Sequence, residues 1–239
     1  KIIKLLKLGL YPSLFPFLFK GIVPSFEHER ILKFIGKQGS LVDCGSNKGQ
    51  FALLSFKINK FSQYVGFDPI LYPTFLISYL KKRKVKVFFN KMALSNCQGV
   101  KNFFITKRDD SSSLKKPKEI ASEYFQDVYT VNQRVVKVSK LSSFIDLINY
   151  LKEPRLLKID VQGNEYELLK GSESVLNLFK YIIIECTYLD LYEDVKFKIE
   201  DINDFLVQNN YTLAKEYNKV VRRNELISSD RLYIKRPMY

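Results

Sequence analysis

Short β-rich runs alternate with helical segments along most of this chain, and this alternation constrains the fold more than any other feature of the sequence. From residue 25 onward, each apolar run ends in a turn and is followed by apolar residues at helical spacing. Parallel strands need crossover helices, so the pattern favours a mostly parallel sheet with helices on both faces. The first five predicted strands are Ser40–Cys44, Tyr64–Phe67, Val85–Phe89, Leu156–Asp160 and Tyr181–Cys186.

The first three strands and their helices indicate a βαβαβ half of a Rossmann-like fold. Predicted helices are Phe26–Lys37 ended by Gly39, Gln50–Asn59, Pro73–Lys82, Ser143–Leu151, Glu165–Leu178 and Ile199–Asn209, and the runs Thr212–Tyr217 and Leu232–Lys235 close the chain as strands. The alternation of strands and helices is interrupted between about residues 96 and 141, where two β-rich runs, Lys101–Thr106 and Arg134–Val138, flank a polar segment. We interpret this stretch as an insertion over the open edge of the site. No linker divides residues 25–239, so we expect one domain.

The segment LVDCGSNKGQFALL is an apolar strand, a glycine turn and a helix. Its spacing of Gly45 and Gly49 matches neither the dinucleotide-binding nor the triphosphate-binding motif. Asp43 before the turn would repel a diphosphate and favour a ligand with an ammonium or sulfonium charge, and S-adenosylmethionine carries both. Asp68, at the end of the next strand, is placed to accept hydrogen bonds from ribose hydroxyls. The alternative is an ordinary strand-turn-helix unit with an incidental acid.

Six segments in order resemble the FkbM family of methyltransferases: VDCGSNKGQF, GFDP, ALSNCQG, DDSSSL, LLKIDVQGNEYELLKG and IIIECTYLDLY. The similarity runs from about Phe26 to Arg236 and includes FEHERIL and SSDRLYIKR, which resemble the flanks of a bacterial subgroup associated with surface-glycan synthesis. One difference from the family pattern is GFDP, where an FEP-type sequence is more usual. The acid of this segment, Asp68, is shorter than the one in that pattern.

The resemblance implies a Rossmann-like class I methyltransferase with a seven-stranded sheet, S-adenosylmethionine as methyl donor and S-adenosylhomocysteine as product, and O-methylation of sugars or small molecules. It implies that Asp160 faces the methyl group and that Gly163 and Gly171 are structural. The residues expected to hold the cofactor, in addition to Asp160, are Asp43, Gly45, Ser46, Asn47, Gly49, Gln50 and Phe51 around the turn, Asp68 and Pro69 at the ribose, and Met92 and Ala93 at the adenine.

A hydroxyl acceptor must lose a proton, and a base in the site must take it. Asp160 is the first candidate, because a carboxylate at the carboxyl end of a central strand points into the crevice of such a sheet. His28 is the second, since a neutral imidazole titrates near working pH, although it could be a surface or capping residue. Glu185 could orient the acceptor or satisfy buried backbone donors. Asp160 with Glu185 lacks a third ligand, so no metal is expected.

The polar segment of the insertion offers hydroxyls and carboxylates that could bind the hydroxyl groups of a sugar. The alternative is a solvated loop. Its candidate substrate-binding residues are Asp109, Asp110, Ser111, Ser112 and Ser113.

The net charge of +14 raises a nucleic-acid methyltransferase as the alternative function. The lysines are scattered, no arginine cluster with interleaved aromatics is present, and an Asn/Asp-Pro-Pro-Tyr/Phe motif is missing, so a small-molecule or glycan acceptor is preferred. A domain that binds S-adenosylmethionine or a glycan without turnover is the non-enzymatic alternative. The unpaired spacing of Cys44, Cys97 and Cys186 indicates reduced thiols in a cytoplasmic protein.

The first 24 residues are apolar, aromatic and basic. The uncharged run Leu8–Phe19 is shorter than the roughly 20 residues that span a bilayer and contains two prolines. Lys1, Lys4 and Lys7 fall at helical spacing. Residues 1–24 are therefore predicted to be an amphipathic arm that packs on the domain or, alternatively, contacts the inner face of a membrane. The oligomeric state stays open.

Overall fold

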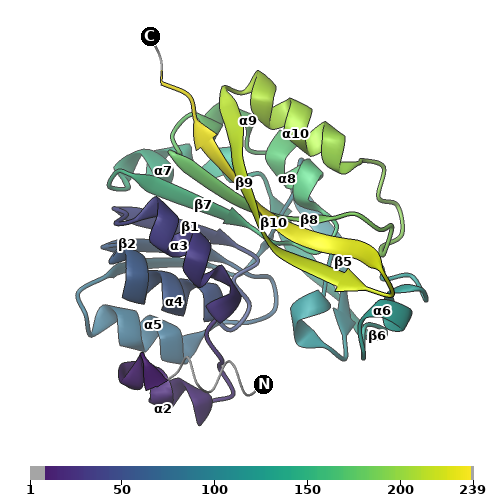
Figure 1. Ribbon diagram of the computed structural model, residues 1–239, viewed down its shortest axis with the longest axis horizontal. Coiled ribbons are helices and arrows are strands. Elements are labelled where there is room, and N and C mark those ends of the chain that lie inside the picture. The colour runs from purple at the N-terminus through teal and green to yellow at the C-terminus, as the bar shows by residue number, and fades with distance from the viewer. Residues whose placement is uncertain (1–8, 238–239) are drawn as a thin grey trace.

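The computed structural model describes residues 9–237 and has a seven-stranded main sheet in the order β3-β2-β1-β7-β8-β10-β9. Strand β10 pairs antiparallel with both neighbours, and the other pairs are parallel (Figure 1). This is the predicted α/β architecture. The strands are β1 (Ser40–Cys44), β2 (Gln63–Phe67), β3 (Lys86–Asn90), β7 (Arg155–Ile159), β8 (Tyr181–Thr187), β9 (Tyr211–Arg222) and β10 (Glu225–Lys235).

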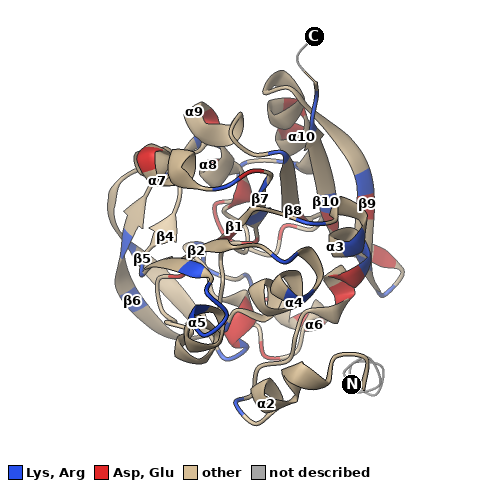
Figure 2. Cartoon of the chain, turned by 90° about the vertical axis from the view of Figure 1, so that its left-hand side faces the viewer, with Lys and Arg blue, Asp and Glu red and all other residues tan. Residues whose placement is uncertain are grey.

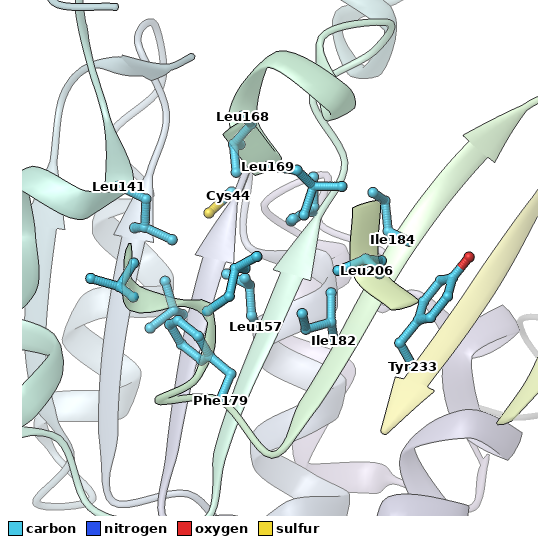
Figure 3. Close-up of a cluster of buried hydrophobic side chains, with 14 of the residues drawn as sticks. Cys44, Leu141, Leu157, Leu168, Leu169, Phe179, Ile182, Ile184, Leu206 and Tyr233 are labelled. Carbon is cyan, nitrogen blue, oxygen red and sulfur yellow. The ribbon is translucent and has the colours of Figure 1, made fainter. Parts of the chain in front are cut away.

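Helices cover both faces of this sheet because side chains alternate along each strand. On β7, Leu157 and Ile159 belong to one buried cluster and Leu156 to the other. Figure 3 shows the first cluster, where Leu157, Ile182 and Ile184 of the strands meet Leu168 and Leu206 of the helices. The first face carries α7 (Ile145–Tyr150), α8 (Glu165–Lys170), α9 (Glu173–Leu176) and α10 (Ile199–Gln208), and the second carries α3 (Glu29–Ile35), α4 (Gln50–Asn59) and α5 (Thr74–Lys81).

Three predicted helices differ clearly from the observed ones. The predicted helix Phe26–Lys37 begins as a 3-10 helix, η2 (Phe26–His28), and α3 ends at Ile35 because Gly36 takes a φ of 68°. The first residues of the predicted helix Ser143–Leu151 belong to a 3-10 helix, so α7 begins at Ile145. The predicted helix Glu165–Leu178 is divided into α8 and α9 at Gly171. A Cβ at Gly171 would lie 2.1 Å from the carbonyl oxygen of Ser95, so the close approach of that loop requires glycine there.

Strands β9 and β10 are much longer than the two predicted runs. The extra residues of β10 include Ser228, Ser229 and Asp230, which are buried although they are polar. Small polar residues have low β propensity, so the sequence pattern did not reveal this part of the strand.

The stretch interpreted as an insertion contributes most of a second sheet with the order β4-β6-β5. The two predicted β-rich runs lie within β5 and β6. The helices and strands between residues 93 and 144, in chain order, are β4 (Ala93–Leu94), β5 (Gly99–Thr106), η3 (Asp109–Ser111), α6 (Ala121–Tyr124), β6 (Thr130–Ser139) and η4 (Leu141–Phe144).

The described part of the N-terminal arm packs on α5. It forms η1 (Pro12–Leu14) and α2 (Phe15–Leu18), and the Phe17 ring lies edge-on to Phe75 and Tyr79 with centroids 4.7 and 4.8 Å away. Residues 1–8 of the predicted arm lie outside the described residues. Within residues 9–237, no helix is both long and apolar enough to cross a membrane.

Candidate active site

A cavity of about 1000 Å³ lies at the carboxyl ends of β1, β2, β7 and β8. Open α/β sheets bind ligands at this edge. Its lining comes from the main sheet, the insertion and the last residues of the arm. Of the residues predicted from the sequence, those that line it are His28, Gly45, Ser46, Asn47, Gln50, Phe51, Asp68, Pro69, Met92, Ala93, Asp109, Asp110, Ser111, Ser112, Asp160 and Glu185.

Three predicted site residues are not among those that line the cavity. Asp43 is fully buried within β1, and a Cβ at Gly49 would meet Leu76 Cδ2 at 2.2 Å. The Ser113 hydroxyl is also buried and donates to the carbonyl oxygen of Gln162 at 2.5 Å. These three residues support the wall of the cavity from behind.

The turn after β1 depends on glycine at its first position. Gly45 has a φ of 79°, and a Cβ there would lie 1.8 Å from the carbonyl oxygen of Asp160. The backbone N–H groups of Gly45 and Ser46 both donate to the carbonyl oxygen of Phe67 at 3.0 Å. The buried Ser46 Oγ and Asn47 Oδ1 have no hydrogen-bond partner among the described residues. The turn therefore presents polar atoms to a ligand.

Asp68 follows β2 and has three backbone partners. Its Oδ2 accepts from the N–H of Asn47 at 3.0 Å, and its Oδ1 accepts from the N–H groups of Ile70 and Leu71 at 2.8 and 2.6 Å. Burial raises the pKa of this carboxyl, although these bonds oppose the shift. A carboxylate has about four acceptor positions, so one remains for a ligand.

A buried lysine connects β1 to the end of β7. Lys158 is the cross-strand neighbour of Asp43, and its Nζ lies 3.7 Å from Asp43 Oδ1 and 2.9 Å from Asp160 Oδ2. It also donates to the carbonyl oxygen of Gly45 at 3.3 Å. Burial alone would lower the pKa of Lys158, but the two carboxylates raise it above its ordinary value. Burial raises the pKa of Asp43 to about 6 against the opposing charge of Lys158. A cation is thus fixed beneath the turn.

The pKa values of the neighbouring carboxyl groups of Asp160 and Glu185 shift in opposite directions. Burial would raise the pKa of Asp160, but the charge of Lys158 and hydrogen bonds from Glu185 and Gln162 lower it below its ordinary value. Burial and the neighbouring charges of Asp160 and Asp230 raise the pKa of Glu185 well above its ordinary value. These shifts favour the ionised form of Asp160 and the protonated form of Glu185.

Gln162 joins this pair to Tyr192, which follows β8. Its Nε2 donates to Asp160 Oδ1 and Glu185 Oε2, both at 2.7 Å, and its Oε1 accepts from the Tyr192 hydroxyl at 2.9 Å. Gln162 has a φ of 57°. The turn is held by Glu165, which accepts from the N–H groups of Val161 and Gly163.

His28 pairs with an acid from the other end of the chain. Its Nε2 lies 3.1 Å from Asp230 Oδ2, and that carboxylate also accepts from Asn218 Nδ2 at 2.6 Å. The buried Nδ1 has no hydrogen-bond partner among residues 9–237. Burial of the ring would lower its pKa, but the Asp230 carboxylate raises it above the ordinary value. The arrangement is that of a base oriented by a carboxylate.

The polar segment of the insertion closes one side of the cavity. Lys48, from the glycine turn, lies 2.5 Å from Asp109, and Arg108 Nε lies 2.6 Å from Asp110. The Tyr192 hydroxyl donates to the carbonyl oxygen of Ser111 at 3.2 Å. The segment is thus attached to both the turn and the residues after β8.

Lys158, Gln162, Tyr192 and Asp230 had no predicted role, yet all four line the cavity. A lysine inside the apolar run LLKID was a usable signal, because a lysine in a buried strand needs a paired charge. Gln162 and Tyr192 lie within the motifs that carried the family resemblance, and Asp230 lies in its C-terminal flank. Nothing in the local sequence indicates that Asp230 meets His28. Among residues 9–237, no three His, Cys, Asp or Glu side chains are placed to hold a metal ion.

Comparison with solved structures gives distant similarities. One is to magnesium protoporphyrin IX methyltransferase from Synechocystis PCC 6803, solved with bound SAM, at 10% identity and a TM-score of 0.46, covering 88% of this chain and 81% of that one. Another is to 1,6-didemethyltoxoflavin-N1-methyltransferase from Burkholderia thailandensis, also at 10% identity, with a TM-score of 0.44, covering 88% and 75%.

A search of curated protein sequences found no match. The model of the methyltransferase FkbM domain matches residues 43–213, which is more than half of the chain and includes the glycine turn, the Asp160 loop and β8. The chain therefore belongs to the FkbM methyltransferase family.

Proposed function

We propose that this chain is an O-methyltransferase that methylates a hydroxyl group of a sugar, a glycan precursor or another small molecule. The observation that carries the proposal is the His28–Asp230 pair, with Nε2 and Oδ2 3.1 Å apart, in the same cavity as the glycine turn. A base oriented by a carboxylate is what proton removal from a weakly acidic hydroxyl requires.

S-adenosylmethionine is the methyl donor of the family. When bound, it supplies a methyl group on a positively charged sulfur. The residues of the turn fit it: Ser46 Oγ and Asn47 Oδ1 are buried polar atoms without a hydrogen-bond partner among the described residues, and Gly45, Ser46 and Asn47 all line the cavity. We assign the ribose to the remaining acceptor position of Asp68 and the adenine to Met92 and Ala93.

His28 is the better placed of the two candidate bases. The carboxylate of Asp160 is held by Lys158, Gln162 and Glu185, and its lowered pKa makes it a weak base. Asp230 holds the Nε2–H of His28 and so leaves the lone pair of Nδ1 unused. The acceptor proton passes to Nδ1, and the charge that forms on the ring is stabilised by Asp230.

The Asp160–Glu185 pair orients the acceptor. Oxygen atoms of Asp160 and Glu185 that the pair itself does not use can accept hydrogen bonds from hydroxyls of the acceptor. The negative charge of Asp160 also favours a positively charged ligand group at the end of β7. Asp109, Asp110, Ser111 and Ser112 would contact the more distant hydroxyls of the acceptor.

The proposal is tested by incubating the chain with S-adenosylmethionine carrying a deuterated methyl group and a panel of sugars and nucleotide sugars. Mass spectrometry should detect a labelled product, and NMR should place the methyl group on oxygen. His28→Gln should make far less product while S-adenosylhomocysteine affinity stays within severalfold. Methylation of nitrogen, or of added RNA in preference to every sugar, would contradict the proposal.

A further inference from the structure

The arm carries four exposed apolar side chains, Leu10, Phe15, Phe19 and Val23, which we together call the arm surface. These side chains are 73%, 43%, 88% and 38% exposed. Between them, Leu14 and Phe17 are buried. The arm is therefore fixed to the domain by one set of apolar residues while it presents another set to the outside.

Positive charge accompanies this surface. The first 26 residues contain four lysines, at positions 1, 4, 7 and 20, and no acidic residue. Lys20 is exposed and adjoins Phe19. In Figure 2, the segment around α2 shows blue and no red. Apolar and aromatic side chains interspersed with lysines are typical of a segment that lies in the interface of an anionic membrane.

The end of the arm reaches the cavity through Val23, one of the four residues of the arm surface. Gly21 and Val23 are exposed and also line the cavity. The N–H of Ser25 donates to the carbonyl oxygen of Gln50 at 3.3 Å, which ties the end of the arm to the start of α4. A surface in contact with the arm would thus lie beside the entrance to the cavity.

We propose that the arm surface docks the protein on an anionic lipid membrane, with the entrance of the cavity beside the lipid headgroups. A second copy of the chain is a less suitable occupant. Four side chains are far fewer than the 20 to 30 residues a side, or roughly 800 Å² per partner, of a stable interface, and the lysines of two copies would repel each other. An anionic membrane offers both an apolar layer and opposite charge.

The proposal is tested by co-sedimentation of the full chain with vesicles made of equal amounts of phosphatidylglycerol and phosphatidylcholine, without methyl donor or acceptor. The wild-type chain should sediment with these vesicles, less in high salt and less with phosphatidylcholine alone. Phe15→Ser with Phe19→Ser should weaken binding about tenfold or more, because two aromatic side chains no longer enter the interface.

The matched control is Phe34→Ser, because Phe34 is an aromatic residue of α3 that is 59% exposed and lies outside the arm. It should bind vesicles as the wild type does. Equal binding by the double variant and the wild type would overturn the proposal. The proposal would also be overturned if the wild-type chain formed a dimer that does not bind vesicles and the double variant were a monomer. Since no catalysis is measured, failure here is distinguishable from failure of the proposed methyl transfer.

Discussion

The glycine turn and a second part of the cavity lining, which we call the side-chain wall, are constructed differently. In the turn, the backbone N–H groups of Gly45 and Asn47 donate to the Phe67 carbonyl oxygen and to the Asp68 carboxylate at the end of the adjacent strand. In the side-chain wall, His28 pairs with Asp230 from the far end of the chain, and the Tyr192 hydroxyl donates to Gln162. The turn depends on backbone conformation, and the side-chain wall depends on contacts between side chains that are far apart in the sequence.

If the turn holds the cofactor and His28 is the base, as we propose, this difference separates cofactor binding from methyl transfer. A ligand held by a backbone turn tolerates changes in distant side chains, whereas a base oriented by a distant carboxylate does not. We therefore expect substitutions in the side-chain wall to lower turnover while cofactor affinity remains. Substitutions that disturb the turn should remove both.

The largest effect on stability is expected for Lys158→Met, because Lys158 lies between Asp43 and Asp160 and supports both the turn and the side-chain wall. Without it, two buried carboxylates lose their cation, and the free energy of unfolding should fall by about 3–5 kcal/mol. Urea unfolding measures this, with the exposed Lys140→Met as control. A loss below about 1 kcal/mol would show that other groups neutralise the carboxylates.

Gly45→Ala tests the turn alone. A Cβ 1.8 Å from the Asp160 carbonyl oxygen and a φ of 79° should cost about 3 kcal/mol and abolish cofactor binding. Gly36→Ala is the matched control, because it also has a positive φ, 68°, but has open space around its Cβ. It should lose some stability and keep its affinity for S-adenosylhomocysteine. Equal affinity in both variants would show that the turn does not hold the cofactor.

Asp230→Asn tests the side-chain wall. The imidazole loses the carboxylate that orients it, so kcat should fall about a hundredfold, while S-adenosylhomocysteine affinity stays within severalfold. Steady-state kinetics and calorimetry measure the two quantities. If the affinity fell as far as kcat, the turn and the side-chain wall would not be independent.

The pH dependence sharpens the same test. His28 acts only when neutral, so kcat should rise with pH through the pKa of His28, which Asp230 raises above the ordinary value. In Asp230→Asn, this rise should move to lower pH. The raised pKa also means that the His28–Asp230 pair stabilises the fold fully below the unfolded pKa of about 6.5 and less as pH rises through the folded pKa. A kcat profile that does not move would exclude His28 as the base.

The smallest effect is expected in the insertion. Asp109 is half exposed and pairs with Lys48, so Asp109→Asn should change stability by less than about 1 kcal/mol. If Asp109 contacts the acceptor, the KM for the acceptor should rise severalfold with kcat unchanged. Asp127→Asn breaks a similar exposed pair, with Lys107, and Asp127 is not among the residues that line the cavity. The two variants would behave alike if the segment were only a solvated loop.

The local parts of the fold and site could be predicted from the sequence. The order of strands and helices follows from periodicity, and the turn at Gly45 is visible because strand, glycine and helix are adjacent in the chain. Helix ends were less accurate, since Gly36 and Gly171 act through a backbone conformation and a close contact that a pattern does not contain.

The side-chain wall could be predicted only in part. His28, Asp160 and Glu185 were expected at the site, but Asp230 was not, because it lies about 200 positions from His28 in the sequence. Lys158 and Gln162 are near Asp160 in the sequence, but their side-chain contacts with it depend on the folded turn after β7. The sequence also did not indicate which of Asp160 and His28 is the stronger base. The charge of Lys158 lowers the pKa of Asp160, whereas the Asp230 carboxylate raises the pKa of His28.

The most direct test of this account is calorimetric titration of S-adenosylhomocysteine into the wild type, Gly45→Ala and Asp230→Asn, with NADH and ATP as controls. We predict selective micromolar binding of S-adenosylhomocysteine to the wild type and to Asp230→Asn, and none to Gly45→Ala. Absence of binding to a folded wild-type chain, or equal loss in both variants, would contradict the assignment of cofactor and base to separate parts of the cavity lining.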